Sequence, residues 1–340
     1  MLDVTQLNPT FVCGHRASGG GLLISLLDYH PELLVYPDES KFFYLFYPIM
    51  LETNASTIEK IQCVKSKILE FTRAILVEKC SATNNHFDYS SFVTNFERNI
   101  SDTSEWHNYL TAIIQAYADA SPQPKNQLIR WVERTTSSEI YAHEINKCFP
   151  NCKFIHNIRD PRDNYASLKS RWHNKLRYLS DTTTLESLRQ SCIERGKLGM
   201  EMGITNHTIF GEEKYIFSRY EDIVTDNANA LKIIAEFLGI DADRFSHSPT
   251  FCGLPWGGNN FDKQKFDNVS SVQVGRWKER IDDHEAALIE FHFKDLMVYF
   301  GYKLEYSEAQ QVEAAQKHYI WLNYSSDRKA DFSLAEKISF

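Results

Sequence analysis

Short apolar runs alternate along the chain with amphipathic stretches in which apolar residues recur every three or four positions. The apolar runs predict strands over residues 10–14, 127–132, 152–158 and 215–218. The amphipathic stretches predict helices over residues 22–28, 57–79, 106–118, 137–147, 163–172, 184–203, 227–238 and 283–300. Strands that alternate with helices typically form a parallel sheet with helices on both faces, so the pattern predicts an α/β fold.

The ends of these elements carry the usual stop and start residues. His30-Pro31 follows the first helix, and Gly239 follows the helix over 227–238. Ser137 or Ser138 is placed to cap the helix over 137–147. We find no internal repeat and no proline-rich linker. We therefore expect a single domain over 1–340, with a helical insertion near 55–120 and a C-terminal extension near 305–340.

Composition narrows the class of protein. The chain has 340 residues, with 37 Lys and Arg against 45 Asp and Glu, a formal net charge of −8. This charge disfavours nucleic acid and other extended polyanions as partners, although a local basic pocket is compatible with it. The seven cysteines show no paired spacing, which favours a reducing compartment. The N-terminus does not resemble a signal peptide, and no apolar run approaches the ~20 residues of a membrane span, so we predict a cytoplasmic protein without a membrane partner.

The first motif with chemical potential is a glycine-rich turn. Residues 11–23 read Phe-Val-Cys-Gly-His-Arg-Ala-Ser-Gly-Gly-Gly-Leu-Leu, a strand that leads through a turn into a helix. Backbone N–H groups at such a helix N-terminus can bind phosphate or sulfate, and glycine lets the backbone approach the anion. The Gly-Lys-Ser/Thr of a Walker A motif is missing. A plain tight turn remains the alternative.

The second motif lies where the clearest buried strand ends. Residues 154–169 place Arg159 directly after the strand and Ser167 in the helix that follows. Ligands of open α/β sheets bind at the carboxyl ends of strands, and an arginine there can hold a phosphate in a bidentate fashion. The alternative is a surface ion pair of Arg159 or Arg162 with a nearby aspartate, which would contribute little stability.

Two weaker motifs follow. Phe217-Ser-Arg-Tyr-Glu-Asp-Ile223 is a strand end followed by acidic residues, and Val274-Gly-Arg-Trp-Lys278 is a small basic and aromatic cluster. Taken in order, the four segments resemble the sulfotransferases that use 3′-phosphoadenosine 5′-phosphosulfate (PAPS). The resemblance covers residues 10–280 and includes the His-Pro after the first helix. It implies a three-layer parallel sheet flanked by helices, as in P-loop nucleotide kinases, with PAPS as donor, 3′,5′-diphosphoadenosine (PAP) as product and no metal.

The resemblance also implies roles for particular residues. Arg159 and Ser167 match the residues that bind the 3′-phosphate, and Tyr220 matches a tyrosine near the adenine. Arg276, Trp277 and Lys278 match a late loop that closes over the nucleotide. The turn around the 5′-phosphosulfate matches Arg16, Ala17, Ser18, Gly19, Gly20 and Gly21.

This turn departs from the family pattern at three positions. Ala17 stands where a basic residue is usual, and Gly20 and Gly21 stand where two hydroxyl residues are usual. Losing one charge-stabilising donor can cost about a hundred- to a thousand-fold in rate. Three accounts stay open: an engineered inactive chain, a natural relative that binds nucleotide without turnover, or an active enzyme in which Arg16 takes the missing role.

Two further segments supply candidate catalytic residues. Glu39 is the candidate general base because some relatives carry a catalytic glutamate in the corresponding segment, with Asp38 as the alternative. Glu133 and Arg134 match a Trp-X-(Glu/Asp)-Lys-Thr stretch of the family, and Arg134 could offset the loss at Ala17.

The predicted reaction is sulfuryl transfer to a hydroxyl or amine of a small-molecule, saccharide or peptide acceptor. The alternatives are a nucleotide-binding homologue without turnover and a P-loop kinase of small molecules. A homo-oligomer stays open. His143-Glu144 begins a zinc-protease pattern, but Lys147 stands where the second histidine belongs, so we predict no metal site. His156 is expected to be a hydrogen-bonded core histidine.

Overall fold

The computed structural model describes residues 2–51, 56–77, 87–100, 105–173, 185–258, 266 and 268–327. They fall into two compact units. The first comprises Met1–Ile158 and Met202–Ser271, and the second comprises Arg159–Glu201 and Val272–Phe340. The single domain over 1–340 stays a prediction.

The first unit is built on a five-stranded parallel sheet with strand order β2-β3-β1-β4-β5. This confirms the predicted α/β fold. The shortest strand, β2, was not predicted because three apolar residues carry no periodicity. The strands are β1 (Asn8–Cys13), β2 (Leu33–Val35), β3 (Arg130–Arg134), β4 (Lys153–Ile158) and β5 (Tyr215–Arg219).

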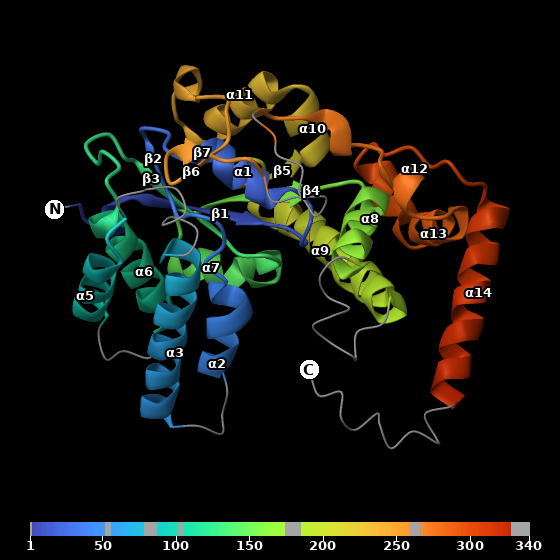
Figure 1. Cartoon of the computed structure of the whole chain (residues 1–340), viewed down its shortest axis with the longest axis horizontal. Helices are drawn as coiled ribbons and strands as arrows, with labels where there is room; N and C mark the ends of the chain where they lie inside the picture. Colours follow the sequence, from blue (N-terminus) through green and yellow to red (C-terminus); the bar gives the residue numbers. More distant parts are fainter. Residues whose placement is uncertain are drawn as a thin grey trace. The chain divides into compact units, whose positions relative to one another are not determined.

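Alternate residues of each strand pack into two separate layers. Phe11 and Trp131 join one hydrophobic cluster, whereas their neighbours Val12 and Val132 join the other. A strand buried on both faces has no polar face, which explains its continuous apolar sequence. The first layer contains α3 (Thr57–Thr72), α5 (Tyr89–Asn99), α6 (Trp106–Ala120) and α7 (Ala142–Cys148), and the second contains α1 (Gly20–Leu27), α10 (Tyr220–Thr225) and α11 (Asn227–Leu238) (Figure 1).

The predicted cap at Ser137 or Ser138 is wrong. Ser137 adopts a left-handed conformation with φ 59°, and its side chain caps nothing. Its N–H instead donates to the carbonyl of Gly14 at 3.0 Å. The segment begins with a 3₁₀ turn over Ser138–Tyr141, and the α-helix starts only at Ala142. Ser137 in the loop after β3 therefore stabilises the turn after β1 and does not cap the helix that follows it.

Other boundaries differ by smaller amounts. The helix predicted over 57–79 ends at Thr72 and continues as a π-helical turn to Val77, and residues 78–79 lie outside the described part. The stop at Gly239 is confirmed, with φ 73° at the helix end. A two-stranded antiparallel ribbon, β6 (Thr250–Phe251) with β7 (Leu254–Pro255), was not predicted.

The second unit is helical. It contains α8 (Pro161–Arg171), the first part of α9 (Leu185–Phe210), α12 (Trp277–Arg280), α13 (Asp283–Tyr299) and α14 (Glu308–Asp327). Helix α13 starts with a capping box between Asp282 and Glu285. In the C-terminal extension, residues 305–307 are not helical, α14 spans Glu308–Asp327, and residues 328–340 lie outside the described part. Among the described helices, none has the length and apolar character that a membrane span requires.

Gly14 provides a test of how tightly the first turn is built. It has φ 124°, and a Cβ at this position would overlap the carbonyl oxygen of Asn157. We expect Gly14→Ala to lower the free energy of unfolding by about 3 kcal/mol in urea denaturation. Gly211→Ala is the control, since Gly211 also has positive φ (75°) but open space around it. It should cost about 1 kcal/mol; equal losses in the two variants would contradict this packing argument.

Candidate functional site

The glycine-rich turn lies between β1 and α1. Gly19 is the N-cap of α1, and its carbonyl accepts from the N–H groups of Leu22 and Leu23 at 2.9 and 3.1 Å. The N–H groups of the first helical residues, which include Gly20 and Gly21, have no partner within a helix. Together with the helix dipole they favour an anion at this end of α1.

Neighbouring strands hold this turn in place. The N–H of Gly14 donates to Glu139 Oε2 at 2.9 Å, and its carbonyl accepts from Ser137. On the other side, the side-chain amide of Asn157, at the end of β4, donates to the carbonyl of Ser18. A Cβ at Gly19 would overlap the ring of Tyr220, so this tyrosine packs directly against the turn.

Arg134 lies over the first turn of α1. A Cβ built on Gly20 would be 2.7 Å from Arg134 Nε and 3.3 Å from its Cδ. The arginine can therefore occupy this place only because residue 20 has no side chain. Its Nη1 is 3.7 Å from Asp38 Oδ1, and the side chain is 15% exposed. A cation thus stands beside the helix N-terminus although Ala17 does not provide one.

Glu39 lies in a strained loop after β2. Its neighbours Asp38 and Lys41 have φ 62° and 55°, which non-glycine residues rarely adopt. Glu39 Oε1 accepts from the N–H of Thr136 at 2.7 Å. Ala17 (φ 64°) and Ser137 adopt the same conformation, so the loops after β1, β2 and β3 each contain such a residue, as do three other places in the first unit, at Tyr29, His247 and Cys252. Such strain is typical of functional loops.

The buried carboxyl group of Glu133 is hydrogen-bonded to this loop. Glu133 Oε1 accepts from Ser40 and from Thr135, the latter at 2.6 Å. Its Oε2 has no hydrogen-bond partner among the described residues, although the side chain is fully buried. Burial raises the pKa of Glu133 to about 7. The core histidine is also confirmed: His156 is buried and hydrogen-bonded to the Tyr215 hydroxyl at 2.7 Å.

The second unit holds the other predicted residues. Arg159 follows the last residue of β4 in the chain, and its Nη2 donates to the carbonyl of Gln273 at 2.9 Å. Ser167 is half-buried on α8. The arginine–aspartate ion pair considered as an alternative is present and involves Arg162. Its Nη2 lies 2.7 Å from Asp160 Oδ2. This pair is buried and not a surface feature.

The late turn over Gly275–Lys278 is fastened to α8 by a residue that sequence reasoning missed. Asp163 accepts from the N–H of Gly275 at 2.7 Å and from the N–H of Trp277 at 2.8 Å. The Arg162 guanidinium lies 4.3 Å from the centre of the Trp277 ring. The missed signal is an acidic residue in the first turn of α8, three positions after Asp160, the helix N-cap.

The predicted residues therefore divide between the two units. The first unit brings Arg134 and Tyr220 to the turn over 16–21, whereas Glu39 lies in the loop after β2 and accepts from the Thr136 N–H. The second contains Arg159 and Ser167 on or beside α8, and Arg276, Trp277 and Lys278 in the late turn. In the described part of the chain, no group of His, Cys, Asp or Glu residues is arranged to hold a metal ion.

A model of the sulfotransferase family matches residues 9–244, which include the glycine-rich turn, Arg134, Arg159 and Tyr220. The chain belongs to the sulfotransferase family. Cytosolic sulfotransferase 3 of Arabidopsis thaliana is 31% identical over 182 residues, which cover 48% of this chain and 53% of that protein. The match spans about half the length of this curated relative.

Solved sulfotransferase structures share the fold. The sulfotransferase domain of the Synechococcus PCC 7002 olefin synthase has a TM-score of 0.54 at 18% identity, with 88% of this chain and 96% of that chain covered. The sulfotransferase domain from the curacin biosynthetic pathway has a TM-score of 0.50 at 14% identity, covering 88% and 99%. At these identities the likeness concerns the fold alone, which is the predicted P-loop-like α/β fold.

The buried carboxyl of this sulfotransferase-family chain predicts a pH dependence of stability. Glu133 has an ordinary pKa of 4.5 and a folded pKa of about 7. Between these values the folded chain keeps a proton that the unfolded chain releases, so this group's stability contribution is complete below pH 4.5. It is lost as pH rises through 7. Glu133→Gln stays neutral, so we expect its stability relative to wild type to increase from pH 5 to pH 8. The size should be of order 1 kcal/mol per unit of pKa difference.

Urea unfolding at pH 5, 6, 7 and 8 measures this difference. Glu139, whose pKa burial also raises to about 7, is present in both proteins and cancels in the comparison. A difference in unfolding free energy that does not change with pH would show that Glu133 is ionised in the folded chain throughout.

Proposed function

We propose that this sulfotransferase-family chain moves a sulfuryl group from PAPS to a hydroxyl or amine of an acceptor and releases PAP. The observation that carries the proposal is the position of Arg134 beside the first turn of α1, in the space that Gly20 leaves open. It supports an active enzyme in which a cation from β3 replaces the one missing at residue 17.

Each unit contains residues that are suited to hold a phosphate group. In the first unit, the turn after β1 leads into the N-terminus of α1, whose first N–H groups have no partner within the helix, and Gly14 and Gly19 lack the Cβ atoms that would collide with their surroundings. In the second unit, the Arg159 guanidinium is oriented by the Gln273 carbonyl, and Ser167 lies on the helix that follows. Arginine and serine are suited to hold a 3′-phosphate by charge-assisted and neutral hydrogen bonds.

Each catalytic residue then has a separate task. PAPS supplies the sulfuryl group, whose bond to the 5′-phosphate oxygen breaks as the acceptor oxygen or nitrogen bonds to sulfur. Arg134 and the N–H groups of the α1 N-terminus stabilise negative charge at the bridging and sulfuryl oxygens. Glu39, oriented by the Thr136 N–H, accepts the proton that the acceptor loses. Asp38 lies nearer to Arg134 and serves to orient the guanidinium rather than to take this proton.

Nucleotide selectivity tests the proposal. We expect PAP to bind at least tenfold more tightly than 5′-AMP or ATP, because only PAP carries the 3′-phosphate that Arg159 and Ser167 are proposed to hold. Isothermal titration calorimetry with the three nucleotides measures the ratio. Tight ATP binding without a 3′-phosphate preference would support the P-loop kinase instead. PAP binding without PAP release from PAPS, over a panel of hydroxyl and amine acceptors, would support a homologue without turnover.

Arg134 provides a sharper test of the cation's role. We expect Arg134→Gln to weaken PAP binding about tenfold, which corresponds to the loss of one charge-assisted hydrogen bond. Arg134→Lys keeps the charge and should lose less. Gly20→Ala is the matched variant at the other side of the contact, because its Cβ would be 2.7 Å from Arg134 Nε and would displace the guanidinium. Unchanged PAP affinity in both Arg134→Gln and Gly20→Ala would rule out this role.

A further inference from the structure

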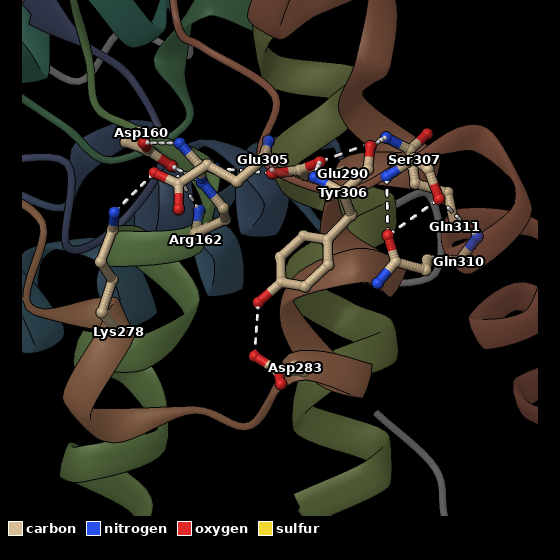
Figure 2. A network of polar contacts seen from close by, with 10 residues as sticks. All are labelled: Asp160, Arg162, Lys278, Asp283, Glu290, Glu305, Tyr306, Ser307, Gln310 and Gln311. Atoms are coloured by element: carbon tan, nitrogen blue, oxygen red, sulfur yellow. Dashed lines mark hydrogen bonds and ion pairs between the residues drawn. The ribbon is translucent and has the colours of Figure 1, made fainter.

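Glu290 is a fully buried carboxylate at the centre of a polar network in the second unit (Figure 2). Its Oε1 accepts from Arg162 Nη1 at 2.6 Å and from the N–H of Glu305 at 2.9 Å. Its Oε2 accepts from the N–H of Tyr306 and from Gln311 Nε2, both at 3.1 Å. A buried charge is tolerated only when it is paired and hydrogen-bonded, and Glu290 on α13 meets both conditions.

Arg162 connects this carboxylate to the late turn. Its Nε and Nη2 bind the two oxygens of Asp160 at 3.0 and 2.7 Å, so carboxylates on two sides fix the plane of the guanidinium. The Trp277 ring packs on that plane, at 4.3 Å from its central carbon. The position of Trp277 thus depends on how firmly Arg162 is held, and Glu290 supplies one of the two carboxylates that hold it.

A second contact joins the 305–311 segment to the late turn without involving Arg162. Lys278 Nζ lies 2.6 Å from Glu305 Oε1, and the N–H of Glu305 is one of the four donors to Glu290. Figure 2 shows Lys278 of α12 and Arg162 of α8 on one side of the network, Tyr306 and Gln311 on the other, and the Glu290 carboxylate between them. The segment over 305–311 therefore supports the late turn both through Arg162 and directly.

We propose that Glu290 is a positioning residue for the nucleotide site, and that the segment over 305–311 is part of the support for the Gly275–Lys278 turn. This inference rests on the proposed function, because that function makes the turn a nucleotide contact. Glu290 and the segment lie beyond residues 9–244, which the family model matches. The C-terminal extension thereby gains a role in holding the donor.

The expected effect of Glu290→Gln follows from the loss of the carboxylate charge. Glu290→Gln leaves the Arg162 guanidinium with Asp160 as its remaining carboxylate partner in this network, and one end of the new amide presents N–H groups to donors. The guanidinium keeps its two bonds to Asp160 but loses the ion pair that ties it to α13, so the Trp277 ring packs on a less firmly held side chain. The turn loosens while α8 and α13 remain folded.

Glu285→Gln is the matched control. Glu285 is also a buried carboxylate on α13, and it binds α8 through Lys169 Nζ at 2.6 Å and the Tyr165 hydroxyl at 2.8 Å. It contacts neither Arg162 nor the 305–311 segment in any hydrogen bond or ion pair of the described chain. The two variants therefore lose comparable contacts between the same two helices, but only Glu290→Gln affects the turn.

Two measurements on the full chain test the proposal. Hydrogen exchange without nucleotide should show the amides of Gly275 and Trp277 exchanging at least tenfold faster in Glu290→Gln than in Glu285→Gln. The ratio of PAP to 5′-AMP affinity should fall at least fivefold in Glu290→Gln and stay near the wild-type value in Glu285→Gln. Thermal unfolding of both variants shows whether they are equally stable. A purely structural role would move stability without changing the affinity ratio.

The outcomes separate this proposal from the one on which it rests. A wild-type chain without preference for PAP over 5′-AMP would overturn the proposed function and the nucleotide role of the turn with it. A wild-type preference that Glu290→Gln retains, with exchange equal to that of Glu285→Gln, would overturn only the positioning role. If Glu290→Gln does not fold, Gln311→Met removes one of the four donors at similar volume. It should accelerate exchange of the same two amides, and no acceleration would contradict the proposal.

Discussion

The hydrogen bonds of the Gly14 backbone hold the glycine-rich turn in place, and the chemistry proposed for the first unit depends on the position of that turn. The N–H of Gly14 is held by the buried Glu139 carboxylate, its carbonyl by Ser137, and its missing Cβ leaves room for the Asn157 carbonyl. These partners come from β4 and from the loop after β3, the neighbours of β1 in the sheet. The turn is therefore oriented by both adjacent strands before any ligand binds, so its N–H groups need little reorganisation to receive an anion.

Charge at this turn is supplied from another part of the sequence. The family pattern places a cation within the turn, whereas this chain has Ala17 there and a guanidinium from β3 beside Gly20. The Arg134 side chain packs in the space beside Gly20. A Cβ at residue 20 would displace the arginine, so the two residues depend on each other. Gly20 thus leaves open the space that the Arg134 side chain occupies, and at residue 134 the family pattern also has a basic residue.

The second unit uses buried ionic groups in a different way. Arg162, Asp160 and Glu290 are withdrawn from water and satisfy each other, which gives geometric precision more than net stability. Burial raises the pKa of Asp163, while its two backbone donors and Arg159 favour its charged form. The short stretch from Arg159 into the first turn of α8 thus carries a predicted phosphate-binding arginine and supports the late turn through Asp163, so loosening one is expected to affect the other.

Periodicity and turn residues are local signals, so they were enough to predict the parallel α/β class and most of the strands and helices. Arg159 and the glycine-rich turn were proposed as site residues from the same kind of signal. The sequence could not reveal the three-residue strand β2, the reversed role of Ser137, the clamp by Asp163 or the network around Glu290. The contact of Arg134 with Gly20 and the contacts of residues 305–311 with Glu290 and Lys278 emerge only in the tertiary structure, because they join positions far apart in the chain. These contacts depend on side-chain volume and hydrogen-bond geometry, which produce no periodic pattern in the sequence.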